Sequence, residues 1–175
     1  LYLMSHALYQ PLSAPEVVRW FWDHREAKVG FKWHPIQGKP VVENATSLLQ
    51  PYPPIRSIMD GDTYRLIAAA DGCVLVGNST TGIEALCFKK PMVECKLPDH
   101  KYSYSDQGTM PAANGMEDSS ALILSLIENG VPQEFQDGAE AYLQRHFAYY
   151  KNGFDGKTVE RVVQLTEKIL DVKGG

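Results

Sequence analysis

The chain has 175 residues, of which 44% are hydrophobic and 22% charged, so it is long enough for one domain with a substantial core and short for two. Its formal net charge is −4, and no run of Lys or Arg exceeds two residues. This composition argues against the continuous basic surface that a nucleic-acid-binding protein needs. We therefore expect a single globular domain with no nucleic-acid partner.

The cysteines and the beginning of the chain bear on its cellular context. The chain has an odd number of cysteines, namely Cys73, Cys87 and Cys95. Each lies in an apolar stretch where a small thiol packs well. They are interpreted as reduced core residues of a cytoplasmic protein. No apolar run approaches the roughly 18 residues that span a bilayer. Because the chain begins at Leu1 within the pattern of a buried strand, we expect an excised domain.

The amino-terminal segment predicts a strand, a helix and a second strand. Residues 1–8 are mostly apolar, which is typical of a strand buried on both faces. A capping box begins at Ser13 and predicts a helix that runs to about Ala27. Residues 28–33 predict the second strand, which ends at His34 because the following proline has no amide hydrogen to donate.

The clearest strand lies in the middle of the chain. Prolines punctuate residues 36–54, where the best strand candidate is 40–43. A turn that ends at Asp62 caps a short predicted helix over residues 63–70. The continuously apolar segment Cys73–Gly77 then predicts a buried strand.

Helix and strand signals alternate again after this segment. Residues 81–88 have helical character, and residues 91–95 predict a further strand. Strands that alternate with helices favour a parallel sheet covered by helices on both faces, which is an α/β Rossmann-like fold. We expect the strand Cys73–Gly77 to be central in that sheet.

The carboxy-terminal part consists of a long polar loop followed by helices. The loop spans residues 97–115, a length that is usually functional or mobile. Helices are predicted over residues 119–128, 133–150 and 158–170. Apolar residues recur at helical spacing in the last helix, which predicts that it docks on the sheet and closes the fold.

Small hydroxyl residues and glycine follow the predicted central strand, in the order Asn78-Ser79-Thr80-Thr81-Gly82. A strand that ends in such a turn and opens a helix presents free amide hydrogens and the positive end of the helix dipole. That arrangement binds phosphate. An ordinary helix cap by Ser79 or Thr80 explains the same residues equally well.

Two further side chains could act beside this turn. Glu84 lies in the first turn of the predicted helix, where its carboxylate can accept both ribose hydroxyls of a nucleotide or simply interact with the helix dipole. His34 lies at the carboxyl end of a predicted strand, where open α/β sheets bind ligands. Its ring could donate to a phosphate oxygen or protonate a leaving group, although a lone histidine is more often structural.

Other kinds of site have weaker support. The sequence contains no Cys-x-x-Cys, no His-x-x-x-His and no dense acidic cluster, so no metal site is expected. Gly-x-Gly-x-x-Gly is absent, and Ser79 lacks the Gly-x-Ser-x-Gly elbow of serine hydrolases. No cofactor is expected.

Several segments, taken in order, resemble the C-terminal half of GT-B-type glycosyltransferases, most closely those of bacterial surface-polysaccharide synthesis. These segments are Phe31–Pro35, Leu66–Asp71, Asn78–Ala85 with Lys90-Pro91, and in the tail Phe147, Tyr150, Asp155-Gly156 and Glu160–Val162. Similar segments occur in glycerophosphotransferases that use CDP-glycerol and in sugar-nucleotide 2-epimerases. The resemblance therefore indicates the fold better than the reaction.

The resemblance implies that residues 1–175 form one nucleotide-sugar-binding domain and that an N-terminal acceptor domain is missing. The implied activity is metal-independent transfer from a nucleotide-diphosphate sugar to a cell-surface polysaccharide or related acceptor, with His34 as the catalytic residue. The implied substrate-binding residues are Ser79, Thr80, Thr81 and Gly82 for the diphosphate and Glu84 for the ribose. The domain alone is expected to bind nucleotide weakly and to transfer no sugar.

Alternative functions remain open at this point. The domain could belong to a CDP-glycerol-type glycerophosphotransferase or to a sugar-nucleotide 2-epimerase. It could also be a regulatory module that binds a nucleotide without catalysis, or a purely structural domain. Peripheral association of the full-length enzyme with a membrane is compatible with the resemblance.

Overall fold

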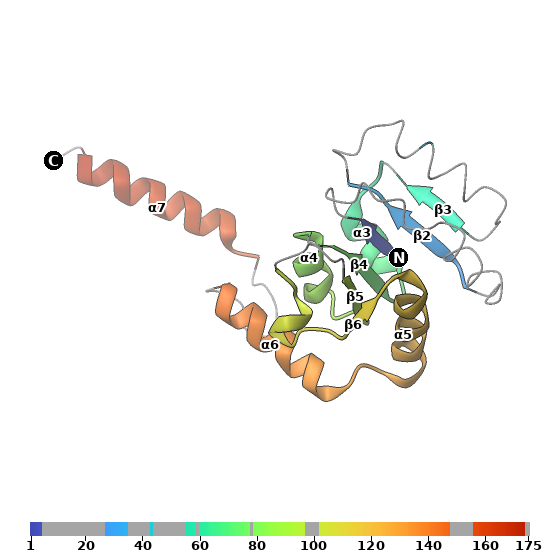
Figure 1. Ribbon diagram of the computed structural model, residues 1–175. Helices are drawn as coiled ribbons and strands as arrows, with labels where there is room; N and C mark the ends of the chain where they lie inside the picture. The colour runs from blue at the N-terminus through green and yellow to red at the C-terminus, as the bar shows by residue number, and fades with distance from the viewer. Residues whose placement is uncertain are drawn as a thin grey trace.

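The computed structural model describes residues 1–4, 27–34, 43, 55–58, 60–77, 79–96, 102–147 and 156–173. Strands in these residues form one sheet in the order β3-β2-β1-β4-β5-β6, and every neighbouring pair is parallel (Figure 1). This is the strand order of the doubly wound Rossmann fold. The predicted α/β Rossmann-like class is confirmed.

The elements follow one another along the chain in the alternation that the sequence predicts. The strands are β1 Tyr2–Met4, β2 Val29–Lys32, β3 Ile55–Ile58, β4 Cys73–Val76, β5 Met92–Lys96 and β6 Ala112–Asn114. The described helices are α3 Thr63–Ala69, α4 Thr81–Cys87, α5 Met116–Asn129, α6 Gln133–His146 and α7 Thr158–Lys173, with a short 3-10 helix, η1, at Ser105–Gln107.

β4 occupies the centre of the sheet, as predicted. It pairs with β1 on one side and with β5 on the other, both in parallel, and all of its residues are buried. Val74 and Leu75 point to opposite faces, since successive side chains of a strand alternate, and they belong to two separate core clusters. A strand buried on both faces needs a continuously apolar sequence, which explains why this segment is the clearest strand in the chain.

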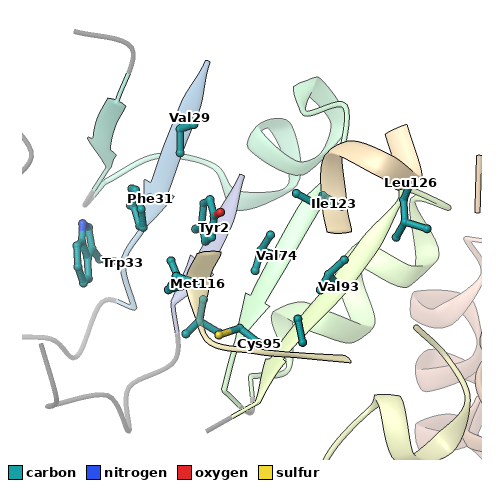
Figure 2. Close-up of a cluster of buried hydrophobic side chains, with 12 residues drawn as sticks. Tyr2, Val29, Phe31, Trp33, Val74, Val93, Cys95, Met116, Ile123 and Leu126 are labelled. Carbon is teal, nitrogen blue, oxygen red and sulfur yellow. The ribbon is translucent and has the colours of Figure 1, made fainter. Parts of the chain in front are cut away.

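α5 covers one face of the sheet. Its residues Ile123 and Leu126 share a buried cluster with Val74 of β4 and Val93 of β5 (Figure 2). Full burial of each such side chain stabilises the fold by about 1.5–3 kcal/mol relative to exposure. The cluster therefore fixes α5 against β4 and β5.

Aromatic rings extend this cluster across β1 and β2. The rings of Tyr2 and Phe31 are stacked at 4.7 Å between centroids, and those of Phe31 and Trp33 at 6.3 Å (Figure 2). The hydroxyl of Tyr2 forms a hydrogen bond with that of Ser120 on α5. A buried tyrosine needs such a partner for its hydroxyl, so the bond also links β1 to the helix.

The opposite face carries α3, α4 and α6. These helices contribute Ile67, Ala85 and Leu143 to a second buried cluster, which includes Leu3 of β1 and Leu75 of β4. Helices therefore lie on both faces of the sheet, as predicted. The two clusters together hold β1 and β4, the strands at which the sheet order reverses.

Two strands lie where no strand was predicted. β3 (Ile55–Ile58) directly follows a proline-rich segment, and β6 (Ala112–Asn114) consists of residues with low strand propensity. Both are short edge strands, whose hydrogen bonds with a neighbouring strand define them. The predicted strand candidate 40–43 lies outside the described residues except for Glu43, which is helical.

The boundaries of other predicted elements shift. α5 begins at Met116, which is earlier than the predicted 119, and α6 ends at His146 within the predicted 133–150. Residues 13–26 of the predicted helix lie outside the described residues. So do residues 5–8 of the first predicted strand. The predicted loop 97–115 contains η1 and β6 in its described part.

The prediction that the last helix docks on the sheet is wrong. α7 forms as predicted, but Val159, Val162, Val163 and Leu165 are 74%, 58%, 49% and 60% exposed. In Figure 1 the helix extends away from the sheet. Helical periodicity indicates an amphipathic helix, but it does not indicate which surface covers the apolar side.

Candidate functional site

The carboxyl ends of all strands meet at one edge of the parallel sheet, the carboxyl edge. The strand order reverses between β1 and β4, and open α/β sheets bind their ligands in the crevice outside such a switch point. Ser79 to Glu84 follow β4 directly at this point. His34 follows β2, so that β1 lies between His34 and β4.

The turn between β4 and α4 is held by its own hydrogen bonds. Ser79 Oγ accepts a hydrogen bond from the Thr81 amide at 3.3 Å and donates one to Thr81 Oγ1 at 3.0 Å. The amide of Gly82 donates to the Ser79 carbonyl at 3.0 Å, and that of Ile83 to the Thr80 carbonyl at 2.9 Å. These amides are therefore already bonded rather than free for phosphate.

The turn also carries hydroxyl groups that can meet a ligand. Thr80 is exposed and makes no capping bond with its side chain, and Thr81 receives the Ser79 hydrogen while keeping its own hydroxyl hydrogen to donate. Because Ser79 Oγ accepts from the Thr81 amide, residues 79–81 form a serine turn. This turn is similar to the ordinary helix cap by Ser79 that was the alternative interpretation of the sequence. Asn78 lies outside the described residues.

Gly82 has a packing reason to be glycine. A Cβ atom on this buried residue would lie 2.7 Å from Leu75 Cδ2 and 3.1 Å from Tyr104 Cε2. Leu75 is itself fully buried in β4, so it has no open space into which to move. The glycine allows α4 to approach the sheet closely, which places the turn but does not in itself indicate a phosphate contact.

Glu84 is half-buried and has a partner that the sequence did not suggest. The hydroxyl of Tyr64, at the start of α3, donates to Glu84 Oε1 at 3.3 Å. The charge of Glu84 raises the pKa of Tyr64 above its usual value, so the phenol remains a donor at neutral pH. Among the described residues, Tyr64 is the one donor recorded for this carboxylate, and Oε2 faces no recorded donor.

Tyr104 supports the turn from the interior. Its hydroxyl donates to the Ser79 carbonyl at 3.1 Å, and its ring lies against Gly82. Burial raises the pKa of Tyr104 to about 12, which keeps the hydroxyl protonated as a donor. Tyr104, the residue just before η1, therefore connects that segment to the turn between β4 and α4.

A buried carboxylate on β5 fixes the backbone around Tyr104. Glu94 accepts hydrogen bonds from Ser103 Oγ at 2.6 Å, from the Ser105 amide at 2.7 Å and from the Tyr104 amide at 3.3 Å. Glu94 was not among the predicted site residues, although an acidic residue inside the apolar segment 92–95 was a usable signal. Buried charges need such partners, so the described part of the long loop is anchored to the sheet.

His34 and Lys32 add basic groups at the end of β2. His34 is partly buried, whereas Lys32 is buried and its Nζ donates to the Trp33 carbonyl at 3.0 Å. Burial lowers the pKa of Lys32, and the nearby charge of Asp60 acts in the opposite direction. Adjacent strands lie about 4.8 Å apart, so the ends of β2 and β4 are separated by roughly 10 Å.

Two cavities lined by described residues lie away from this edge. One, of ≈ 470 Å³, is lined by Met92 at the start of β5 and by residues of α4 and α6. The other, of ≈ 450 Å³, is lined by Leu1, Val29 and Gly72 beside the starts of β1, β2 and β4. Both therefore open at the amino edge of the sheet, opposite the predicted site.

Three further observations concern metals, thiols and membranes. Among the described residues, no group of three or more His, Cys, Asp and Glu side chains could hold a metal ion. Cys73, Cys87 and Cys95 are free thiols, and burial raises the pKa of each. Within the described part of the chain, helices are too short or too polar to cross a membrane.

The fold and the reversal of strand order at β1 and β4 define a Rossmann-like α/β domain. No protein-family model matches the chain, and no curated protein is significantly similar to it. Function is therefore inferred from the residues at the carboxyl edge.

Proposed function

We propose that this chain is the nucleotide-binding domain of a GT-B-type glycosyltransferase. It holds a nucleotide-diphosphate sugar at the carboxyl edge for transfer to a cell-surface polysaccharide or a related acceptor. The observation that carries the proposal is the environment of Glu84, a half-buried carboxylate beside the switch point. Its Oε1 accepts a hydrogen bond from Tyr64, and its Oε2 faces no recorded donor in the described residues. A ribose is a ligand that such a carboxylate binds.

The side chains around Glu84 suit the rest of the donor. The hydroxyls of Thr80 and Thr81 lie between Glu84 and the end of β4, where they would donate to the diphosphate. His34 and the ammonium of Lys32 would add charged or polarised donors from β2. Donors that are already fixed in place stabilise charge that develops on a leaving group, and here the leaving group is the nucleoside diphosphate.

Transfer also requires an acceptor, which the resemblance assigns to a second domain. Holding donor and acceptor in one orientation contributes about 7–11 kcal/mol to such reactions. The present site accounts for the donor side alone. Nucleotide binding is therefore the property of this chain to test first.

The test is isothermal titration calorimetry of the chain with UDP, CDP, GDP and ADP, followed by UDP- and GDP-sugars and CDP-glycerol. We expect Glu84→Ala to weaken binding of the preferred nucleotide by about 10- to 150-fold, because removing a charged hydrogen-bonding partner costs about 1.5–3 kcal/mol. A preference for CDP-glycerol over every nucleotide sugar would redirect the proposal to a glycerophosphotransferase.

Glu128→Ala is the matched control. Glu128 is an exposed glutamate near the end of α5, away from the carboxyl edge, so its loss should leave affinity unchanged. Equal affinity of the parent chain and Glu84→Ala for every nucleotide would remove Glu84 from the site.

A further inference from the structure

Tyr64 and Glu84 come from different helices and meet at the carboxyl edge. Tyr64 lies at the start of α3, after the carboxyl end of β3, and Glu84 lies in the first turn of α4, after β4. The Tyr64 hydroxyl donates to Glu84 Oε1 at 3.3 Å. The Tyr64 ring also lies beside that of Phe88, with centroids 6.4 Å apart, so the phenol is oriented at both its ring and its hydroxyl.

The stability of the fold gives no strong reason for this pair. The Tyr64 residue is 54% exposed, and a hydrogen bond at such a surface competes with water. The N-terminus of α3 does not need the Tyr64–Glu84 bond either, because the Asp62 side chain caps it. Asp62 accepts hydrogen bonds from the amides of Tyr64 and Arg65 at 2.9 and 3.3 Å. A pair that joins an exposed tyrosine to a half-buried carboxylate, and in which each side chain orients the other, is suited to meeting a ligand.

The pair presents two neighbouring acceptor groups. Glu84 keeps Oε2, which faces no recorded donor in the described part of the chain. Tyr64 donates its own hydrogen to Oε1 and so presents its oxygen lone pairs outward as an acceptor. Two adjacent acceptors match the two hydroxyl donors of a vicinal diol, such as the 2′- and 3′-hydroxyls of ribose.

We propose that Tyr64 and Glu84 together recognise the ribose diol, Glu84 accepting from one hydroxyl and Tyr64 from the other, so that the site selects ribonucleotides over deoxyribonucleotides. This inference rests on the proposed function, since it assumes that a nucleotide occupies the carboxyl edge. It adds Tyr64 as a specificity-determining residue to the ribose contact already assigned to Glu84.

The experiment compares diol recognition in the parent chain and in Tyr64→Phe. Calorimetry with UDP, CDP, GDP and ADP identifies the preferred nucleotide, which is then titrated beside its 2′-deoxy and 3′-deoxy forms. Tyr64→Phe keeps the ring and removes the hydroxyl. We expect this variant to weaken binding of the ribonucleotide by about 2- to 10-fold. The ratio of ribonucleotide affinity to deoxynucleotide affinity should fall by the same factor for at least one of the two deoxy forms.

Tyr102→Phe serves as the control. Tyr102 is also exposed, but its hydroxyl pairs with that of Tyr142 at 2.8 Å, so the ratio of ribonucleotide to deoxynucleotide affinity should not change. Thermal denaturation of each variant separates loss of fold from loss of recognition. A merely structural tyrosine would change the melting temperature without changing the ratio.

The outcomes separate this inference from the proposed function. Nucleotide binding with the same ratio in the parent chain and Tyr64→Phe would overturn the role of Tyr64 and leave the donor site standing. A second variant, Tyr64→Ala, removes the ring as well as the hydroxyl. A loss of binding in Tyr64→Ala that Tyr64→Phe does not share would assign the contribution to the ring and would also overturn diol recognition. Failure of the parent chain to bind any of the four nucleotides would overturn the proposed function and this inference with it.

Discussion

Gly138 lies where α6 crosses the turn after η1, and its environment shows how a single hydrogen atom can determine packing. A Cβ atom at this position would lie 2.0 Å from the carbonyl oxygen of Gly108, which is backbone and cannot rotate away. Gly108 has a φ of 72°, in the left-handed region that favours glycine. The two glycines therefore allow helix and turn to touch.

We expect Gly138→Ala to destabilise the protein although alanine is the better helix former. The gain in helix propensity is at most about 1 kcal/mol, whereas overpacking against fixed backbone costs about 1–3 kcal/mol or more. Ala141→Gly, at an exposed position of the same helix, measures the propensity contribution alone. Urea denaturation of both variants measures the change in the free energy of unfolding and its sign. If Gly138→Ala were more stable than the parent chain, α6 would not approach Gly108 so closely.

At the scale of elements, α7 differs from the other described helices in having an exposed apolar side. Val162 and Leu165 are 58% and 60% exposed, whereas Leu143 of α6 is 1% exposed. We expect the double change Val162→Gln and Leu165→Gln to alter the free energy of unfolding by no more than about 0.5 kcal/mol per site.

Leu143→Ala is the comparison, and it should cost about 2–5 kcal/mol because it leaves a cavity in a packed core. Chemical denaturation measured by circular dichroism reports both changes. A loss of several kcal/mol in the α7 variant would mean that its apolar side packs against the domain in solution, as the periodicity first indicated.

The same contrast explains which elements could be predicted from sequence. Cys73–Gly77 was predictable because a strand buried on both faces must be apolar throughout. The N-cap at Asp62 was equally local and is confirmed by its bonds to the amides of Tyr64 and Arg65. β3 and β6 were not predictable, since edge strands are defined by their pairing, and Ala112–Asn114 has no strand propensity of its own.

The candidate site shows the same division between local and long-range signals. Ser79, Thr80, Thr81 and Glu84 could be placed at the carboxyl edge because they follow the clearest strand. The partners of these residues could not be predicted, because Tyr64 lies 20 residues from Glu84 and Tyr104 lies 25 residues from Ser79. The bonds within the turn also engage the amides of Thr81, Gly82 and Ile83, which the order of residues alone did not indicate.

For the whole molecule, the central claim is that the carboxyl edge, and not either amino-edge cavity, binds a nucleoside diphosphate. The most direct measurement is a crystal structure of the chain with the nucleotide that calorimetry selects. We expect the ribose against Glu84 and Tyr64 and the diphosphate beside Thr80 and Thr81, on the side of His34. A nucleotide in the cavity lined by Met92 or in the cavity lined by Val29, with the carboxyl edge empty, would contradict it.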